Sequence, residues 1–161
     1  FTVPETTIGG GIELHFEEQT VKDTAAVYNI KDDKIYLVFN HALFKSPMDW
    51  NDATEWKKTQ LHDYLQGVFK NSMQGSDIPV SEVSLLSKDE VFKKKALPFF
   101  KNEKNRIAFE KDGVYAVCYW LKNTTSAAYF YAASNGGIGS RYDAGRADAF
   151  VRPCLTVKKE E

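Results

Sequence analysis

The chain has 161 residues, 43% of them hydrophobic, which is the composition of one ordinary globular domain and not of a disordered segment. Its 21 Lys and Arg nearly balance its 22 Asp and Glu, and the net charge of -1 argues against a nucleic-acid partner held by phosphate contacts. No apolar run approaches the roughly 18 residues of a membrane-spanning helix, so we expect no membrane insertion.

The N-terminal part predicts a lead-in followed by strands. Residues 1–11 are rich in glycine and are expected to be flexible. Residues 12–16 alternate apolar and polar side chains, as a half-buried strand does, and residues 35–39 form a continuous apolar run. An Asp-Asp pair separates residues 28–30 from that run, which predicts a hairpin.

Two helices are predicted in the middle of the chain. Asp52 and Glu55 have the spacing of a capping box, which places the start of the first helix near Asp52. Ser87 and Glu90 form a second capping box, and the helix that follows should end before Pro98. The expected apolar stripes are Trp56, Leu61, Tyr64, Leu65, Val68 and Phe69 on the first helix, and Val91, Phe92 and Ala96 on the second.

The C-terminal part changes to strands. Residues 106–110 are predicted to be irregular or a short helix. Strands are expected over residues 114–121, 127–133 and 150–157, with a Gly-rich turn over 134–140 and a polar loop over 141–148. Strands, then two helices, then an antiparallel meander are typical of the α+β class. We expect a single domain over residues 12–157 and a charged tail over residues 158–161.

The sequence contains no motif that nominates a catalytic group. The signatures of serine hydrolases, zinc proteases and P-loop proteins are absent, and Gly137 and Gly139 lack the third glycine of a dinucleotide fingerprint. His15, His41 and His62 stand too far apart for a local metal motif. We therefore predict a protein that is not an enzyme and that has no metal site and no cofactor.

Four residues in predicted strands need a separate interpretation. Cys118 and Cys154 are interpreted as buried free thiols, although a disulfide stays open if their strands are neighbours. Arg152 lies within an apolar strand and needs a buried carboxylate or backbone carbonyls as partner, so we interpret it as structural. Trp120 is interpreted as a core side chain and not as a ligand platform.

Five short motifs follow one another along residues 34–157, which is most of the chain. They are Trp56 with Leu61, Tyr64, Leu65 and Phe69; residues 83–87 with Glu90; residues 119–123; Ala127–Tyr129 with Gly136 and Gly137; and residues 151–155. Together they resemble a bacterial family of unknown function known as DUF6273. Tyr119 stands where that family has Trp, and Lys122-Asn123 where it has Arg-Ser.

This resemblance implies a C-type-lectin-like fold, related to that of formylglycine-generating enzymes and of retroelement-diversified binding proteins. In such a fold two helices pack on a twisted antiparallel sheet, and the C-terminal strands and loops display a ligand surface. Trp50-Asn51-Asp52 matches a triplet of calcium-dependent lectins, but it stands before the first helix, where Asp52 is assigned as a cap. We therefore expect no calcium site.

The composition of the C-terminal stretch points to the same surface. Tyr, Ser and Asn with added Arg are typical of an adaptable binding surface, and loops between rigid strands are where binding residues concentrate. The candidate ligand-binding residues are Tyr129, Tyr131, Ser134, Asn135, Ser140, Arg141, Tyr142, Asp143, Arg146 and Asp148. The alternative is that Tyr129 and Tyr131 pack into the sheet while residues 141–148 form a solvated loop.

Three functions follow as hypotheses. The first is a noncatalytic module at the cell surface of a bacterium or on a phage, which binds a glycan or a protein; its sharper form is a retroelement-diversified receptor. The second is an oxidase similar to formylglycine-generating enzymes, which would need Cys118 and Cys154 to converge as thiolates on Cu(I). The third is a structural domain of a larger surface protein. The sequence leaves the oligomeric state open.

Overall fold

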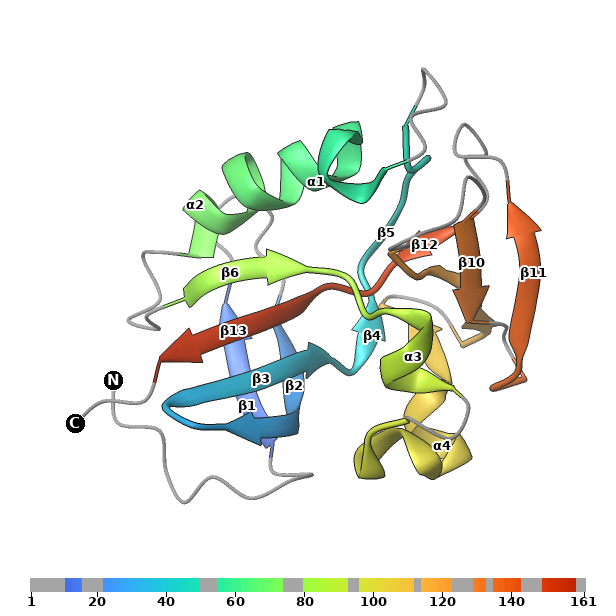
Figure 1. Cartoon of the computed structure of the whole chain (residues 1–161), viewed down its shortest axis with the longest axis horizontal. Coiled ribbons are helices and arrows are strands. Elements are labelled where there is room, and N and C mark those ends of the chain that lie inside the picture. Colours follow the sequence, from blue (N-terminus) through green and yellow to red (C-terminus); the bar gives the residue numbers. More distant parts are fainter. Residues whose placement is uncertain are drawn as a thin grey trace.

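The computed structural model describes residues 11–15, 22–49, 55–73, 80–92, 96–111, 114–122, 129–132, 135–142 and 149–158. Within these residues the chain forms two five-stranded sheets, one three-stranded sheet and several short helices (Figure 1). Most of the strand pairs are antiparallel, so the predicted α+β class is confirmed.

The first sheet contains the N-terminal hairpin. Its order is β1 (Gly11–His15), β2 (Lys22–Lys31), β3 (Lys34–Phe39), β13 (Cys154–Lys158) and β6 (Val80–Ser84). All neighbours in it are antiparallel. The predicted hairpin is confirmed as β2–β3, and Asp32 in its turn has a φ of 56°, a left-handed conformation that Asp adopts more readily than most residues.

The second sheet is built mainly from the C-terminal part. Its order is β11 (Ile138–Tyr142), β10 (Tyr129–Ala132), β9 (Tyr119–Trp120), β12 (Phe150–Val151) and β5 (Phe44–Lys45). The third sheet joins β4 (His41–Ala42), β7 (Ala108–Glu110) and β8 (Ala116–Val117). The predicted antiparallel meander is confirmed for β9, β10 and β11, but it does not continue to the last strand, because β12 pairs with the other edge of β9 in parallel.

Several strand boundaries differ from the prediction. The strand expected over 150–157 is divided into β12 and β13, which belong to different sheets, because Pro153 cannot donate to a strand ladder. The strand expected over 114–121 is interrupted at Cys118. Residues 108–110 are a strand, since pairing with β4 and β8 overrides their weak local signal.

One helical segment runs through residues 60–73, and it begins later than predicted. It consists of α1 (Gln60–Tyr64), a π turn η2 (Leu65–Phe69) and α2 (Lys70–Met73), after the 3-10 turn η1 (Trp56–Lys58). The N-cap is Thr59, whose hydroxyl accepts from the His62 N–H at 3.1 Å. Asp52 lies outside the described residues, and the side chain of Glu55 makes no capping hydrogen bond.

The predicted apolar stripe of this helix holds except at one position. Leu61, Leu65 and Phe69 are buried and Tyr64 is half-buried, but Val68 is 47% exposed. The π turn has i→i+5 hydrogen bonds and more residues per turn than an α-helix. Val68 therefore rotates away from the stripe on which the α-helical period places it.

The second predicted helix is a single turn. The capping box is confirmed: the Ser87 hydroxyl accepts from the Glu90 N–H at 3.3 Å, and the Glu90 carboxylate accepts from the Ser87 N–H at 2.9 Å. Phe92 is already extended, and Pro98 starts a turn where it was expected to stop a helix, as its fixed φ allows. The short helices here are α3 (Lys88–Val91), the 3-10 turn η4 (Pro98–Lys101) and α4 (Glu103–Arg106).

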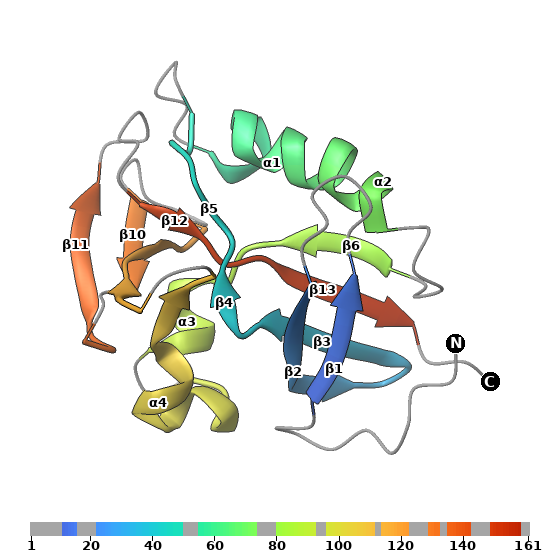
Figure 2. The ribbon, with the colours of Figure 1, turned by 180° about the vertical axis from the view of Figure 1, so that it is seen from behind.

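The core is divided into two clusters. Figures 1 and 2 show α1 and α2 on one side of the strands, and α3 and α4 on the other. Trp120 is fully buried in the cluster beside α1, which confirms its core assignment, and Tyr119 is fully buried in the cluster beside α3 and α4. No helix in the described part of the chain combines the length and apolar character that crossing a membrane requires.

Candidate functional site

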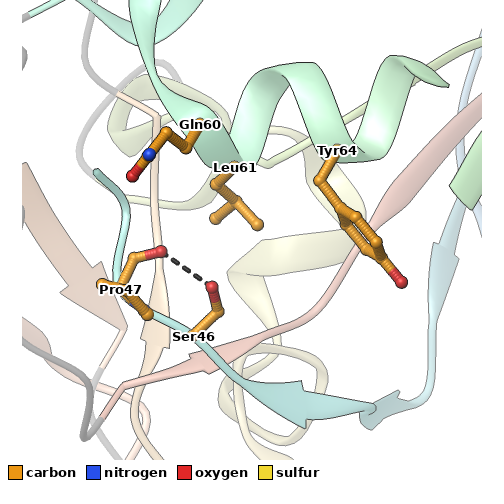
Figure 3. Close-up of a pocket in the computed structure, with 5 residues that line it drawn as sticks. All are labelled: Ser46, Pro47, Gln60, Leu61 and Tyr64. Carbon is orange, nitrogen blue, oxygen red and sulfur yellow. Dashed lines mark hydrogen bonds between the residues drawn. The ribbon is translucent and has the colours of Figure 1, made fainter. Parts of the chain in front are cut away.

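A pocket of about 280 Å³ opens where the chain leaves β5 and meets the start of α1 (Figure 3). It is lined by Ser46, Pro47, Gln60, Leu61 and Tyr64. None of these side chains carries a charge, and polar and apolar side chains are mixed. The lining therefore suits an uncharged, amphipathic group.

The start of α1 is tied to the segment that precedes it. The Gln60 N–H donates to Oδ1 of Asp49 at 3.0 Å, and the Leu61 N–H donates to the Met48 carbonyl at 3.1 Å. Both partners are buried, with Asp49 only 3% exposed. The first N–H groups of a helix lack partners within it, so these bonds satisfy them and fix the two walls of the pocket to each other.

Ser46 links the pocket to the second sheet. Its N–H donates to the Ala149 carbonyl at 3.1 Å, and its own carbonyl accepts from the indole N–H of Trp120 at 2.6 Å. Its hydroxyl donates to the Pro47 carbonyl at 2.8 Å, as Figure 3 shows. Because that hydroxyl has one hydrogen, its remaining capacity is to accept.

The paired strands of the second sheet lead from this pocket to the C-terminal hairpin. Phe44 pairs with Val151, and Trp120 pairs with Tyr131. The parallel pairing of Phe150 with Tyr119 sets Val151 beside Trp120. Phe44, Val151 and Trp120 pack in the core cluster beside α1, and the row of paired residues continues to Tyr131 on β10.

The structure describes six of the predicted ligand residues. Tyr129 and Tyr131 lie in β10, Asn135 lies in the turn, and Ser140, Arg141 and Tyr142 lie in β11. The last three are thus strand residues, and their prediction as turn and loop residues is wrong, because pairing with β10 extends the hairpin. Ser134, Asp143, Arg146 and Asp148 lie outside the described residues.

Three tyrosines take part in the strand pairing of this hairpin. Tyr129 pairs directly with Tyr142, and Tyr131 pairs with Gly139, with a register shift between the two pairs. At the other edge of β10, Tyr131 pairs with Trp120 on β9.

The turn of this hairpin is fixed to α4. Gly136 is buried with a φ of +83°, and a Cβ atom there would lie 2.8 Å from Cγ of Glu103. The guanidinium Nε of Arg106 donates to the Gly136 carbonyl at 2.8 Å, and the Asn135 side chain accepts from the Gly137 N–H at 2.9 Å. Asn135 therefore shapes the turn, whatever else it contacts.

Sequence reasoning missed the pocket residues and the anchor of the turn. Ser46 and Gln60 lie 14 positions apart and carry no shared motif, so no local pattern indicates that they meet. Leu61 and Tyr64 were assigned to the core by their helical spacing. Arg106 gave no signal either, because its bond partner at Gly136 is 30 positions away.

Both cysteines are free thiols, as predicted, but only Cys154 is buried, while Cys118 is half-buried. Burial raises the pKa of the Cys154 thiol to about 12, and Tyr28 is its hydrogen-bond partner. A thiol with this pKa keeps its proton at neutral pH, which works against a thiolate pair for copper. In the described ranges, no three His, Cys, Asp or Glu side chains gather in a way that could hold a metal ion.

We expect the protein to lose stability as the pH rises above about 9. Cys154 has an ordinary pKa of 9.0 when unfolded but about 12 when folded, so at alkaline pH the unfolded chain releases a proton that the folded chain keeps. Burial also raises the pKa of Tyr28 and of Tyr119, which adds to the effect with the same sign. Each such group weakens folding by up to about 1.4 kcal/mol per pH unit.

Urea denaturation between about pH 7 and pH 11 measures this loss. The slope should be shallower in Cys154→Ala than in wild type. Equal slopes in wild type and Cys154→Ala would contradict the assignment to Cys154.

Comparisons of the chain with protein-family models, with curated proteins and with solved structures found no match. The similarity to DUF6273 therefore stays a prediction. Most of the motif residues that carry it are buried here, among them Trp56, Trp120 and Arg152. Buried motif residues bear on the fold and leave the ligand undefined.

Proposed function

We propose that this protein is a noncatalytic binding module of C-type-lectin-like fold, at a bacterial surface or on a phage, and that its β10–β11 hairpin recognises a glycan or a protein. The observation that carries this proposal is the strand pairing that sets Tyr129 opposite Tyr142 and places Tyr131 between Gly139 and Trp120 in the register. Tyrosine supplies large, rigid contact area together with a hydrogen-bonding group, and it is enriched in binding surfaces for that reason.

The position of the hairpin favours this role. β11 is the edge strand of the second sheet, and no described helix lies over β10 or β11 in either view (Figures 1 and 2). The other edge of β10 pairs with β9, and the two residues of β9 are fully buried. A surface supported by a packed core loses little conformational entropy on binding.

Two observations weigh against catalysis. Cys154 keeps its proton, so the oxidase alternative lacks the thiolates it needs. Lys122 Nζ lies 3.3 Å from Ser84 Oγ, but Ser84 is 7% exposed, which leaves a substrate little access to it. The structural-domain alternative makes no use of the tyrosines on the hairpin.

A binding screen against a broad glycan panel, with and without calcium, tests the proposal. We expect a hit that is indifferent to calcium and is weakened at least about tenfold by combining Tyr131→Ala, Arg141→Ala and Tyr142→Ala. Tyr115→Ala is the matched control, because Tyr115 is 74% exposed on the β7–β8 hairpin and should leave binding unchanged. Thermal melts establish that the triple variant is folded.

Two results would count against parts of this proposal. A hit that survives in the folded triple variant places the site away from β10–β11. If no glycan on the panel binds, a glycan ligand is contradicted, and a protein ligand or a structural domain is favoured. The retroelement-diversified form also predicts a near-duplicate of the C-terminal coding segment beside a reverse transcriptase gene, and the lack of one removes that form.

A further inference from the structure

We propose that the pocket between β5 and α1 binds one neutral sugar residue, so that it forms a subsite of the glycan-binding face. This inference rests on the proposed function and names the class of ligand. It starts from the pocket lining of Ser46, Pro47, Gln60, Leu61 and Tyr64. The pocket has a volume of about 280 Å³, near the lower end of the range for small-molecule sites, which suits a single ring better than an oligosaccharide.

The chemistry of the lining matches a pyranose ring. Pro47, Leu61 and Tyr64 provide apolar and aromatic surface, against which the C–H groups of a sugar ring can pack. Ser46 and Gln60 provide the polar part of the same pocket. A sugar has one apolar face and a rim of hydroxyl groups, so it can use both kinds of wall at once.

The hydrogen-bonding groups fit a ligand with hydroxyl donors. The Ser46 hydroxyl donates to the Pro47 carbonyl, so it can only accept from a ligand. The amide of Gln60 carries both a donor and an acceptor. The described residues that line the pocket carry no charge, so they offer no ion pair to compensate a carboxylate or ammonium group for its lost hydration.

The walls of the pocket are held before any ligand arrives. The start of α1 is hydrogen-bonded to Asp49 and Met48, and the Ser46 carbonyl accepts a hydrogen bond from Trp120 on β9. Tyr64 makes an edge contact with Phe44, with ring centroids 5.7 Å apart. Trp120 pairs with Tyr131, so the same row of the sheet connects the pocket to the hairpin.

Titration of the ¹⁵N-labelled full chain with free glucose, galactose and N-acetylglucosamine tests the inference by NMR. We expect the amide resonances of Gln60, Leu61 and Tyr64 to shift saturably with at least one of these sugars. A ligand with so few atoms should have a dissociation constant of roughly a millimolar. Glucuronate, which adds a carboxylate, should bind at least about tenfold more weakly.

Variants separate this pocket from the hairpin. Gln60→Ala combined with Ser46→Ala should weaken the binding of the sugar about tenfold. Gln66→Ala changes the same residue type on the same helical segment outside the pocket and should have no effect. The triple hairpin variant should keep the sugar-induced shifts at Gln60, because the pocket does not include β10 or β11.

No shift at the pocket with any of the three sugars up to about 100 mM overturns the inference. Shifts confined to β10 and β11 also overturn it, while they support the proposed function. Shifts at the pocket together with a glycan hit that survives the triple hairpin variant support the subsite and contradict the hairpin site. The two proposals can therefore fail separately.

Discussion

Replacing Arg152 with leucine should lower the free energy of unfolding by about 3–5 kcal/mol. Arg152 is 3% exposed, and its guanidinium donates to the Phe39 carbonyl at 2.7 Å and to the Asn105 carbonyl at 3.0 Å. It also donates to the Tyr119 hydroxyl at 3.0 Å and lies 5.2 Å from the centre of that ring. Leucine would remove all three hydrogen bonds from a largely buried site.

The location of Arg152 explains why this loss should affect the whole fold. Arg152 and Pro153 form the step between β12 in the second sheet and β13 in the first. Phe39 ends β3 next to this step, and its N–H donates to the Pro153 carbonyl at 3.1 Å. Through its hydrogen bonds to Phe39, Tyr119 and Asn105, Arg152 therefore links both sheets to α4.

Urea denaturation of Arg152→Leu, Arg152→Lys and Lys101→Leu tests this expectation. Lysine keeps the charge but lacks the planar fork of donors, so it should recover only part of the loss. Lys101 is exposed and its replacement should change stability by less than about 0.5 kcal/mol. Wild-type stability in Arg152→Leu would mean that the cost of burying the charge cancels its hydrogen bonds, as it does at some buried ion pairs.

Features that depend on neighbours in the sequence could be predicted without the structure. The Ser87–Glu90 capping box joins groups three residues apart, and the Asp32 turn joins adjacent strands. The need of Arg152 for buried acceptors was also predictable, since a charge within an apolar strand must be satisfied wherever it lies. The sequence did not identify which acceptors, because Phe39 is 113 positions away.

Features that depend on distant parts of the chain could not be predicted. The helix starts at Gln60 because Asp49 and Met48 satisfy its first N–H groups, and no spacing rule connects that segment with the helix. Val68 leaves the apolar stripe because of a π turn, which the 3.6-residue period does not anticipate.

The candidate site divides in the same way. Tyrosine-rich composition indicated the C-terminal region, but the pairing of Tyr129 with Tyr142 became known only from the register of β10 and β11. The register shift in this hairpin is a tertiary feature that alternation along one strand does not specify. The pocket had no sequence signal at all, since its two walls come from segments that meet only in the fold.

Replacing Trp120 with alanine should cost about 3–5 kcal/mol, and Trp120→Phe about 1–3 kcal/mol. The side chain is fully buried in the cluster beneath α1, and its N–H donates to the Ser46 carbonyl at 2.6 Å. Phenylalanine keeps most of the apolar volume but removes that donor. The Ser46 carbonyl then loses its indole partner at the edge of the pocket.

Trp56→Phe is the matched control for this experiment. Trp56 is 7% exposed in the same cluster, and its ring lies edge-on to His62 at 5.2 Å. Both variants lose similar ring volume, so the extra cost of Trp120→Phe in urea denaturation measures the bond to Ser46. Trp120→Phe should also shift the Ser46 and Leu61 amide resonances and weaken the binding of the free sugar. If the two substitutions cost the same and the pocket resonances stay unchanged, the indole N–H does not hold Ser46 in place, and the rigidity argued for the pocket loses its support.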